Sequence, residues 1–309
     1  MTKQPHLSSL PPLIESDTVA IVCPAGKISG SLIDAVNLLE GWGLKVRLGK
    51  SVEASYHQFA GDDALRAADF QQMLDDPEVK AIFAARGGYG TVRIIDRIDF
   101  SRFSKAPKWI VGFSDITVLH SHIQAVWGIP SIHGQMPLTI PDATAPSLDS
   151  LRKALFGERL TYHYPAIPGN RPGKASGVLI GGNLSLLVNV SGSASDPNYQ
   201  GKILFLEDVS EYFYSIDRML WTLKRAGKLA GLQGLLVGGF THLKDNETPF
   251  GYTVHEMIRE KVEAYGYPVA FDFPAGHLSN NHALILGARV QMEVTEEAVV
   301  IKFEPTAII

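Results

Sequence analysis

Residues 79–90 of the chain read VKAIFAARGGYG. The apolar first half of this stretch predicts a buried strand over Val79–Ala84, and its glycines predict a tight loop at the carboxyl end of that strand. Short apolar runs on both sides of it predict three further strands, at Val19–Cys23, Leu44–Leu48 and Trp109–Phe113. The stretch is therefore expected to form one strand of a larger sheet.

Segments with helical spacing separate these strands. Residues 31–42, 62–73 and 116–126 carry apolar side chains three or four positions apart. In the second segment, Asp62 is expected to cap a helix. The expected apolar face of that helix carries Leu65, Ala68, Phe70 and Met73. Regular alternation of strands and helices predicts an α/β fold, with right-handed crossovers and a mostly parallel sheet covered by helices on both faces.

A change in composition divides the chain. Prolines are dense between about Pro137 and Lys174, and such a density favours an extended connection over a core element. Apolar runs that predict strands follow it: GVLIGG, KILFLED, LQGLLVGGF, HALILG and RVQMEV. Helices are expected at Ser147–Phe156, Tyr214–Ala226 and Thr253–Tyr265. We expect an α/β domain over residues 1–140, a linker over residues 141–173 and a smaller β-rich domain over residues 174–309.

Composition excludes several classes of protein. The 309 residues are 45% hydrophobic and 19% charged, with a net charge of −4, so the chain can bury a sizeable core and is not disordered. The absence of a basic surplus gives no reason to expect nucleic acid or an anionic membrane as a partner. No apolar stretch reaches the roughly 18 residues that span a bilayer, and a cytoplasmic protein is expected. The one cysteine, Cys23, lies in an apolar run and is expected to be a buried, unreactive thiol.

Ser114 is the first candidate for chemistry. It lies in IVGFSDIT, where an apolar strand ends and a helical pattern begins just after the serine. A serine on a sharp strand-to-helix turn exposes its hydroxyl near the amides of a helix start, as an activated nucleophile requires. The match to the nucleophile elbow G-x-S-x-G is partial, because Ile116 replaces the second glycine. The alternative is that Ser114 or Asp115 simply caps the helix.

The loop Arg86–Gly90, RGGYG, is the second candidate. Glycines at the end of a strand let the main chain approach a ligand and present its N–H groups to an anion. The loop is neither a Walker A sequence nor a G-x-G-x-x-G fingerprint. A tight turn that needs positive φ is the alternative, although open α/β sheets bind ligands at this end of their strands.

Three further residues are ambiguous when each is taken alone. Glu207 ends the run KILFLED, and it is either the first solvated residue of a turn or a carboxylate that points into a cleft. His277 in PAGHLSNN and His133 in SIHGQMP lie in stretches where histidines are often just exposed. Together, Ser114, Glu207 and His277 supply a nucleophile, an acid and a base, but their order alone does not establish a triad. A metal site has less support, because the chain has no H-E-x-x-H motif.

Several motifs in a fixed order resemble the LD-carboxypeptidase family of serine peptidases, which also includes the microcin C immunity peptidases. The motifs are VAIVCPAG, RGGYG followed by Arg93, GFSD, HGQM, GGNLSLL at residues 181–187, KILFLEDV, YSIDRML and GHLSNNHALILG. They cover nearly the whole chain. The resemblance implies a flavodoxin-like N-terminal domain and a smaller β-rich C-terminal domain, with the site in the cleft between them.

The resemblance also assigns roles. It makes Ser114 the nucleophile, Glu207 the acid and His277 the base, and it forms an oxyanion hole from the amides of Gly88 and Asp115. The neighbouring loop residues Arg86, Gly87 and Tyr89 are candidates for contacts to the substrate. Two departures from the family pattern are Cys23, where small residues are commoner, and Ser279–Asn281, in a loop that more often carries proline.

The implied activity is removal of the C-terminal D-alanine from murein tetrapeptides, at a bond between an L-centre and a D-residue, in cytoplasmic wall recycling. The enzyme is expected to be a homodimer and to need no metal or organic cofactor. The sequence does not identify the cation that receives the terminal carboxylate, or whether the third residue of the substrate is lysine or diaminopimelate. One alternative is a microcin C-type peptidase that cleaves peptide–nucleotide conjugates, for which Trp221 is the nearest aromatic candidate, although packing on its helix is the favoured interpretation. Another is a non-catalytic module that binds an anion at RGGYG.

Overall fold

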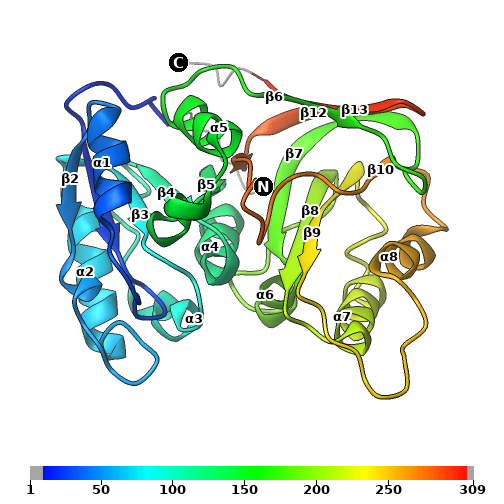
Figure 1. The fold of residues 1–309 in the computed structure, drawn as a ribbon, viewed down its shortest axis with the longest axis horizontal. Helices are drawn as coiled ribbons and strands as arrows, with labels where there is room; N and C mark the ends of the chain where they lie inside the picture. Colours follow the sequence, from blue (N-terminus) through cyan, green and yellow to red (C-terminus); the bar gives the residue numbers. More distant parts are fainter. Residues whose placement is uncertain (1–9, 305–309) are drawn as a thin grey trace, which may run out of the picture.

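The protein contains two β-sheets that stand side by side with helices between and around them (Figure 1). The computed structural model describes residues 10–304, so the outer ends of the two expected domains lie outside the described residues. Among the described residues, no helix has the combined length and apolar character that a membrane span requires.

The first sheet has the strand order β11-β5-β4-β3-β1-β2. Its parallel strands are β1 (Thr18–Val22), β2 (Lys45–Leu48), β3 (Val79–Ala84), β4 (Trp109–Gly112) and β5 (Ser131–His133). The order 2-1-3-4-5 is that of flavodoxin-like sheets, whose ligands bind where the order reverses, outside the ends of β1 and β3. The loop RGGYG follows β3, so it lies at this switch point.

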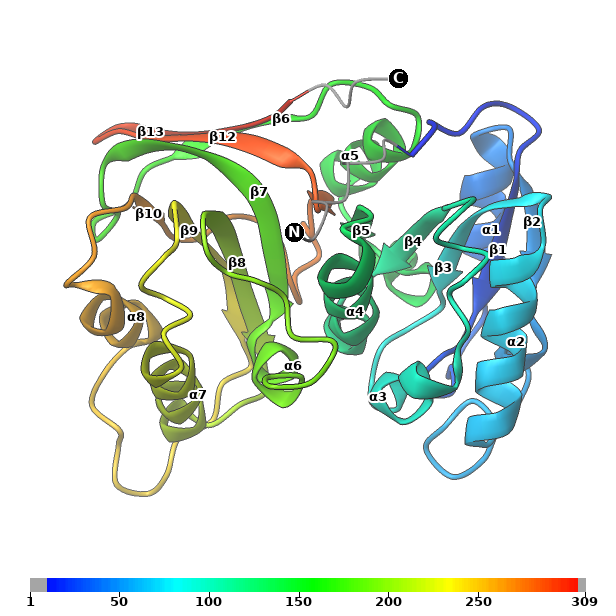
Figure 2. The ribbon, with the colours of Figure 1, turned by 180° about the vertical axis from the view of Figure 1, so that it is seen from behind.

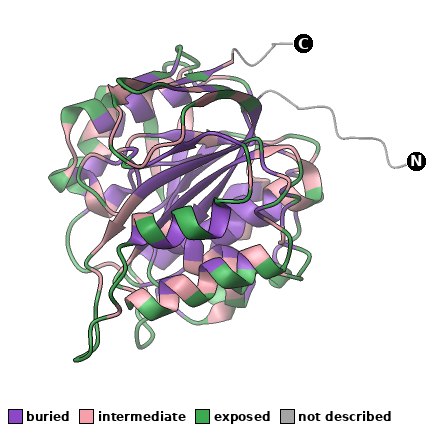
Figure 3. Ribbon diagram, turned by 90° about the vertical axis from the view of Figure 1, so that its right-hand side faces the viewer, coloured by how far each residue is buried: buried purple, intermediate pink, exposed green. Residues whose placement is uncertain are grey.

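Helices cover both faces of this sheet. They are α1 (Ile33–Gly41), α2 (Asp63–Asp75), α3 (Thr91–Ile94), α4 (Thr117–Trp127) and α5 (Ala145–Leu155). At the other side of the molecule, Figure 3 looks onto the second sheet and likewise shows buried strands behind helices whose outer sides are exposed. The α/β alternation expected from the sequence is confirmed, with element ends that differ by one or two residues.

Helix α2 corrects one expectation. Asp62 caps it as predicted, because its Oδ1 accepts a hydrogen bond from the amide of Leu65 at 2.8 Å. The predicted apolar face is only half right, since Leu65 and Ala68 are exposed while the polar side chains of Arg66 and Asp69 are buried with Phe70 and Met73. The inner side of α2 meets main-chain groups of neighbouring loops as well as apolar core. Buried main-chain groups need polar side chains as hydrogen-bond partners, and the spacing of apolar residues does not predict where those side chains lie.

The second sheet has the order β10-β9-β8-β7-β12-β13-β6. Its strands are β6 (Thr161–Pro165), β7 (Gly173–Asn183), β8 (Lys202–Val209), β9 (Gly234–Thr241), β10 (Val269–Ala270), β12 (Arg289–Val294) and β13 (Ala298–Phe303). Strands β7 to β10 are parallel, and the others are antiparallel. One face is covered by α6 (Leu184–Asn189), α7 (Phe213–Arg225) and α8 (Val254–Val262) (Figure 1).

The two faces of β8 belong to different cores, which fixes the direction of its side chains. Leu204 and Leu206 pack with α6, α7 and α8, whereas Ile203 and Phe205 join the large core of the first sheet. Because side chains alternate along a strand, the next odd position, Glu207, faces the first domain. The even position, Asp208, faces the start of α6.

Two crossings of the chain connect the halves. The strand β11 (Leu284–Leu286) comes from the second half of the chain but pairs antiparallel with β5 of the first sheet. Part of the expected linker forms β6, which pairs with β13. Helix α4 lies between the two sheets, next to β7 and α6 in both opposite views (Figures 1 and 2). The strand ends that carry the candidate residues are therefore held against one another.

Candidate active site

Ser114 occupies a strained turn between β4 and α4. Its φ of 63° lies in the left-handed region, which a residue with a side chain seldom adopts without a compensating reason. Gly112, two residues before Ser114, is required by packing, because a Cβ there would lie 2.9 Å from the side chain of Ile116. Ile116 stands where the elbow motif has its second glycine, and its side chain therefore makes the first glycine, Gly112, necessary.

The capping interpretation of this turn is wrong. The cap positions before the short 3₁₀ turn Ser114–Ile116 and before α4 are Phe113 and Ile116, and neither has a capping side-chain hydrogen bond. The buried carboxylate of Asp115 instead accepts a hydrogen bond from the amide of Thr91 at 2.8 Å. It thereby ties the serine turn to the end of the glycine loop.

The glycine loop lies directly against the serine. A Cβ on Gly87 would be 2.9 Å from Cβ of Ser114, 3.1 Å from its Oγ and 3.3 Å from the amide nitrogen of Asp115. Only a glycine at position 87 leaves room for the serine without displacing one of them. The next residue, Gly88, has a φ of 101°, so the turn also needs a glycine there.

The peptide between Gly87 and Gly88 has a fixed orientation. The carbonyl oxygen of Gly87 accepts a hydrogen bond from the amide of Gly26 at 3.1 Å. Because the described peptide bonds are all trans, the N–H of Gly88 points to the opposite side from that carbonyl. Within residues 10–304, neither the amide of Gly88 nor that of Asp115 has a hydrogen-bond partner in the protein. Both donors remain available to a ligand.

The other loop residues form the rim of the site. Nη1 of Arg86 donates to the carbonyl of Lys27 at 2.8 Å, and Tyr89 is 47% exposed with its ring 6.0 Å from that of Phe59. A tyrosine this exposed contributes less to the core than to the surface beside the glycines.

An acid and a histidine meet at the end of strand β8 of the second sheet. Nδ1 of His277 lies 2.7 Å from Oε2 of Glu207, whose side chain is fully buried at the end of β8. The loop holds the ring closely, because a Cβ on Gly276 would be 2.8 Å from the Glu207 side chain. Thr241 donates its hydroxyl to the carbonyl of His277 at 3.3 Å.

The electrostatic environment favours a protonated His277. Burial opposes the charged ring, but the hydrogen bond to Glu207 and the negative charges of Glu207 and Asp208 outweigh it, so the pKa of His277 is raised above its usual value. Burial, and then the neighbouring Glu207 charge, raise the pKa of Asp208 to about 7. One buried carboxylate, Glu207, therefore contacts the imidazole, while the adjacent one, Asp208, acts on it only through its charge.

Direct contacts bring the two halves of the site together. The ring of Phe113 lies edge-on to that of His277, with centroids 4.9 Å apart, and Ser114 is the next residue. The amide of Asn183, at the end of β7, donates to Oγ1 of Thr117 at 3.0 Å, at the start of α4. Within residues 10–304, no hydrogen bond joins the hydroxyl of Ser114 to the imidazole.

His133, the other histidine considered from the sequence, is not at the surface. It is fully buried on β5 between Phe113 and Phe205, with ring centroids 5.7 and 5.0 Å away. Burial holds its pKa well below the usual range, and the ring is a neutral part of the floor beneath the site. Trp221 lies on α7 and its ring contacts Lys261 instead of the serine turn, in agreement with the interpretation as a packing residue.

Asp208 and Asn183 are site residues that sequence reasoning missed. Nδ2 of Asn183 donates to Oδ1 of Asp208 at 2.9 Å, and the amide of Ser185 donates to Oδ2 at the same distance. The pair anchors the start of α6 behind Glu207. Two consecutive acids at the end of a strongly apolar strand were the available signal, because such a strand buries both of its faces.

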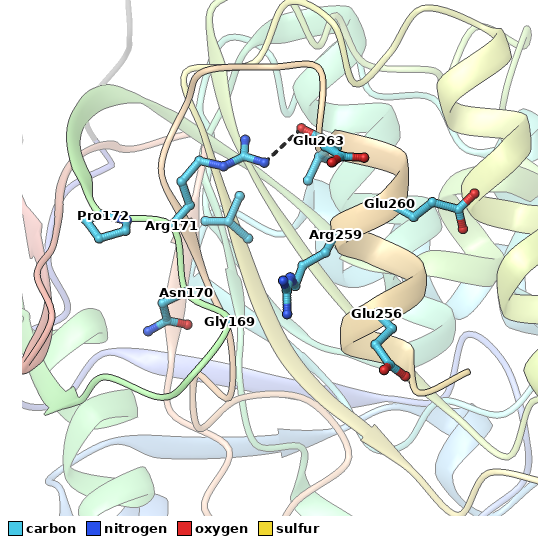
Figure 4. A pocket seen from close by; sticks show the side chains of 10 residues that line it. Gly169, Asn170, Arg171, Pro172, Glu256, Arg259, Glu260 and Glu263 are labelled. Atoms are coloured by element: carbon cyan, nitrogen blue, oxygen red, sulfur yellow. Dashed lines mark hydrogen bonds between the residues drawn. The ribbon is translucent and has the colours of Figure 1, made fainter. Parts of the chain in front are cut away.

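One cavity lies away from the candidate residues. It has a volume of about 600 Å³ and lies between residues 169–172 and α8 (Figure 4). Arg171 and Arg259 share it with Glu256, Glu260 and Glu263. The guanidinium of Arg171 already donates to the carbonyls of Val262 and Tyr265. No candidate catalytic residue lines this cavity, so it is separate from the site.

Metal and thiol chemistry have no visible basis in the described part of the chain. Residues 10–304 contain no group of three or more His, Cys, Asp or Glu side chains arranged to hold a metal ion. Cys23 is buried as expected, and burial raises the pKa of its thiol to about 12, which leaves it protonated and unreactive.

Fold and site together define a class of protein. A glycine loop at the switch point of a flavodoxin-like sheet lies against a strained serine that follows the neighbouring strand β4. A buried acid–histidine pair from the second half of the chain packs on the residue before that serine. This is the arrangement of a hydrolytic enzyme built from two α/β domains.

Comparison with known proteins identifies the family. The LD-carboxypeptidase N-terminal domain matches residues 19–134, and the LD-carboxypeptidase C-terminal domain matches residues 176–292. The chain belongs to the LD-carboxypeptidase family, as its motifs suggested, and it is therefore a hydrolase of the peptidase type.

Individual relatives agree with this assignment. The chain is 38% identical to a probable murein peptide carboxypeptidase of Bacillus subtilis, over 94% of this chain and 93% of the relative. It is 31% identical to the murein tetrapeptide carboxypeptidase of Pseudomonas aeruginosa, over 89% and 92% of the two chains. The structure of muramoyltetrapeptide carboxypeptidase from Oxalobacter formigenes superposes with a TM-score of 0.84 at 28% identity, over 94% of this chain and all of the other. The microcin C7 self-immunity protein MccF, at 22% identity and a TM-score of 0.84, shares the fold.

Proposed function

We propose that the protein is a serine carboxypeptidase that hydrolyses the L,D bond before the C-terminal D-alanine of murein tetrapeptides. The observation that carries the proposal is the buried Glu207–His277 pair, which packs through Phe113 against the strained Ser114 turn. The names of the Bacillus and Pseudomonas relatives supply the substrate class.

Ser114 attacks the scissile carbonyl carbon, and His277 accepts its proton. Because Nδ1 of the imidazole is bound to Glu207, Nε2 is the nitrogen left for the serine hydroxyl. Glu207 fixes this tautomer and stabilises the imidazolium that forms. The serine–histidine hydrogen bond is expected to form when substrate fills the cleft, since such contacts tighten in the substrate complex.

The amides of Gly88 and Asp115 receive the negative charge of the tetrahedral intermediate. Gly88 follows Gly87, whose Cβ position lies 3.1 Å from the serine hydroxyl and 3.3 Å from the amide nitrogen of Asp115, and both amides are free of protein acceptors in the described residues. A donor of this kind contributes about 3–4 kcal/mol to transition-state stabilisation.

Three further proton transfers complete the reaction. The imidazolium gives its proton to the amine of the departing D-alanine as the C–N bond breaks, which leaves an acyl-enzyme on Ser114. Water then attacks the ester carbonyl as His277 takes a proton from it. His277 returns that proton to Oγ of Ser114 as the ester C–O bond breaks, which releases the tripeptide acid. No step needs a metal or an organic cofactor.

The rim of the glycine loop is proposed to hold the substrate. Arg86 supplies a cation beside the glycines, and the exposed ring of Tyr89 supplies a flat apolar surface. Gly87 allows the peptide to approach the serine closely. Residues of this kind position the scissile bond rather than react with it.

Incubation with purified murein tetrapeptide tests the proposal through release of free D-alanine. Wild-type protein should release it, and both Ser114→Ala and His277→Ala should not, with their circular dichroism spectra unchanged. Release by the Ser114→Ala protein at the wild-type rate would exclude the mechanism. Parallel assays with substrates that carry lysine or diaminopimelate at the third position define the preference between them.

Two other functions remain as alternatives with distinct outcomes. A microcin C-type peptidase would hydrolyse an aminoacyl sulfamoyl adenosine faster than the tetrapeptide; the shared fold of MccF motivates this comparison. A non-catalytic anion-binding module would leave both substrates intact, and a fluorophosphonate probe would not label Ser114.

The proposal includes a cytoplasmic location and a homodimer, which follow from the family resemblance. Sedimentation equilibrium of the purified protein measures the second, and a mass of twice 33.7 kDa is expected. Fractionation of cells that express the chain measures the first.

A further inference from the structure

Arg66, on α2, is a fully buried cation whose hydrogen bonds radiate into three loops. Its Nη1 donates to the carbonyl of Pro24 at 2.5 Å and to that of Gly90 at 3.0 Å, and its Nε donates to the carbonyl of Gly61 at 3.3 Å. Its Nη2 is paired with Asp63. The guanidinium also lies over the ring of Phe59, 4.9 Å from the centroid.

A charge in this place opposes folding unless its donors are satisfied. Burial disfavours the charged form and lowers the pKa of Arg66, while Asp63 acts in the opposite direction. An arginine still keeps its proton under these conditions. Hydrophobic residues of similar volume often replace buried ion pairs without loss of stability, so the cation calls for an explanation beyond stability.

Two of the three loops bound by Arg66 form or support the proposed oxyanion hole. The carbonyl of Gly90 belongs to the peptide whose N–H, on Thr91, binds the carboxylate of Asp115. Pro24 starts the loop in which the amide of Gly26 holds the carbonyl of Gly87. Fixing these carbonyls fixes the planes of the Pro24–Ala25 and Gly90–Thr91 peptides, from which the hydrogen bonds to the Asp115 carboxylate and, two residues after Pro24, to the Gly87 carbonyl are made.

Packing around the guanidinium leaves little freedom. Gly90 has a φ of 140°, and a Cβ there would lie 2.7 Å from Nη1 of Arg66. The last glycine of the RGGYG loop is therefore required by contact with Arg66, just as Gly87 is required by contact with Ser114. Arg66 therefore contacts the end of the loop at Gly90, while Ser114 contacts its middle at Gly87.

We propose that Arg66 is a positioning residue that orients the oxyanion-hole amides by holding the Pro24 and Gly90 carbonyls. This inference rests on the proposed function and assigns a role to a residue outside the predicted site. A donor that acts on the oxyanion is used mainly in the transition state. Loss of its orientation should therefore lower kcat and leave KM nearly unchanged.

The test compares Arg66→Met and Arg66→Lys with wild type and with the control Lys108→Met. Lys108 is another buried cation of the same domain, and it donates to the carbonyls of Met73 and Asp76, away from the loop. Asp63 keeps its bidentate contact with Arg93 in the Arg66 variants, at 2.8 and 2.9 Å, which favours their folding. The readouts are kcat and KM for D-alanine release, normalised to active sites titrated with a fluorophosphonate.

In Arg66→Met, kcat per active site should fall about 10- to 100-fold, part of the effect of losing one oxyanion donor, while KM changes less than about threefold. Arg66→Lys keeps the charge but not the fork of donors, so its kcat per active site should lie between those of wild type and Arg66→Met. Lys108→Met should keep its wild-type kcat per active site.

A merely structural role would give a different result. It would reduce the fraction of active sites that can be titrated, but kcat per active site would be unchanged in both Arg66→Met and Lys108→Met. This result would overturn the inference and leave the proposed function intact. If wild type releases no D-alanine but is labelled, the proposed substrate is wrong, and the labelling rates of the same variants decide the role of Arg66. If wild type is neither active nor labelled, both proposals fail.

Discussion

The two halves of the site are built from different parts of the polypeptide. On the first sheet, the groups next to Ser114 are main-chain amides, and glycines set their places because no Cβ would fit. On the second sheet, the imidazole of His277 is joined side chain to side chain to the buried carboxylate of Glu207, which has a second buried carboxylate, Asp208, beside it in the chain. The first half should therefore respond to added volume and the second to changed charge.

The largest effect should come from the residue on which both halves converge. Ser114→Ala removes the nucleophile, and kcat should fall by about 10⁶-fold, as when the serine of a comparable triad is lost. D-alanine release under single-turnover conditions measures it. Alanine at position 114 would relieve little of the strain of the positive φ. The free energy of unfolding should therefore stay within about 1 kcal/mol of the wild-type value. A variant that retains a tenth of wild-type kcat would show that the halves do not meet at this serine.

Glu207→Gln changes charge in the second half without changing its shape. The expected loss in kcat is about 10³- to 10⁴-fold, because an amide can hold the wrong imidazole tautomer. The free base must be neutral, so activity rises with pH through the pKa of His277, which Glu207 raises. Removing the charge lowers that pKa, and the acidic limb of the kcat/KM profile should move to lower pH.

A matched control separates this effect from general loss of charge. Glu293→Gln alters an exposed carboxylate on β12 that pairs with Lys174, and both the rate and the acidic limb should stay unchanged. An acidic limb that moves to higher pH in Glu207→Gln would contradict the assigned electrostatics.

Gly87→Ala adds volume to the first half without changing its charge. The new Cβ would lie 2.9 Å from Cβ of Ser114, so either the serine or the loop must shift. A shift of this size in a donor or nucleophile should lower kcat by about 10²-fold. The acidic limb of the pH profile should not move, which distinguishes this variant from Glu207→Gln. Gly41→Ala, where nothing lies within 4 Å of the new methyl group, is the control and should be fully active.

The difference between the halves also explains what the sequence could reveal. Strand and helix alternation predicted the first sheet. The position of Glu207 alone favoured the first solvated residue of a turn, and this interpretation is wrong because the side chain is fully buried. The glycine loop was a candidate because open α/β sheets bind ligands at the carboxyl ends of their strands, with a tight turn as the alternative. Every residue except proline has a main-chain amide, however, so the sequence pattern did not distinguish the amides of Gly88 and Asp115 from the others. Only the resemblance to a family indicated them.

Other features depend on contacts between distant residues, which local patterns do not encode. Arg66 and Asp69 were absent from the predicted face of α2 because helical spacing identifies apolar residues, while their partners are main-chain groups of other loops. The run HALILG predicted a strand but not its sheet, and β11 pairs with β5 of the first domain. Helix capping is a common role of serine and aspartate at such a position, so it was the alternative for Ser114 and Asp115. The amide of the distant residue Thr91 instead donates to the Asp115 carboxylate, a contact that the local pattern does not predict.

Asp208→Asn should have the smallest effect, because this carboxylate faces α6 and reaches His277 only through its charge. Its charge raises the pKa of His277, so the acidic limb should move to lower pH, by less than in Glu207→Gln. Stability gives a second readout. The folded-state pKa of Asp208 is raised to about 7, above that of the unfolded chain, so its protonated form stabilises the fold at low pH and this contribution is lost as the pH rises toward 7. The free energy of unfolding of wild type minus that of Asp208→Asn, from urea denaturation, should therefore decrease between pH 5 and pH 7; an increase would mean that the buried carboxylate stays ionised and is stabilised by its three N–H donors.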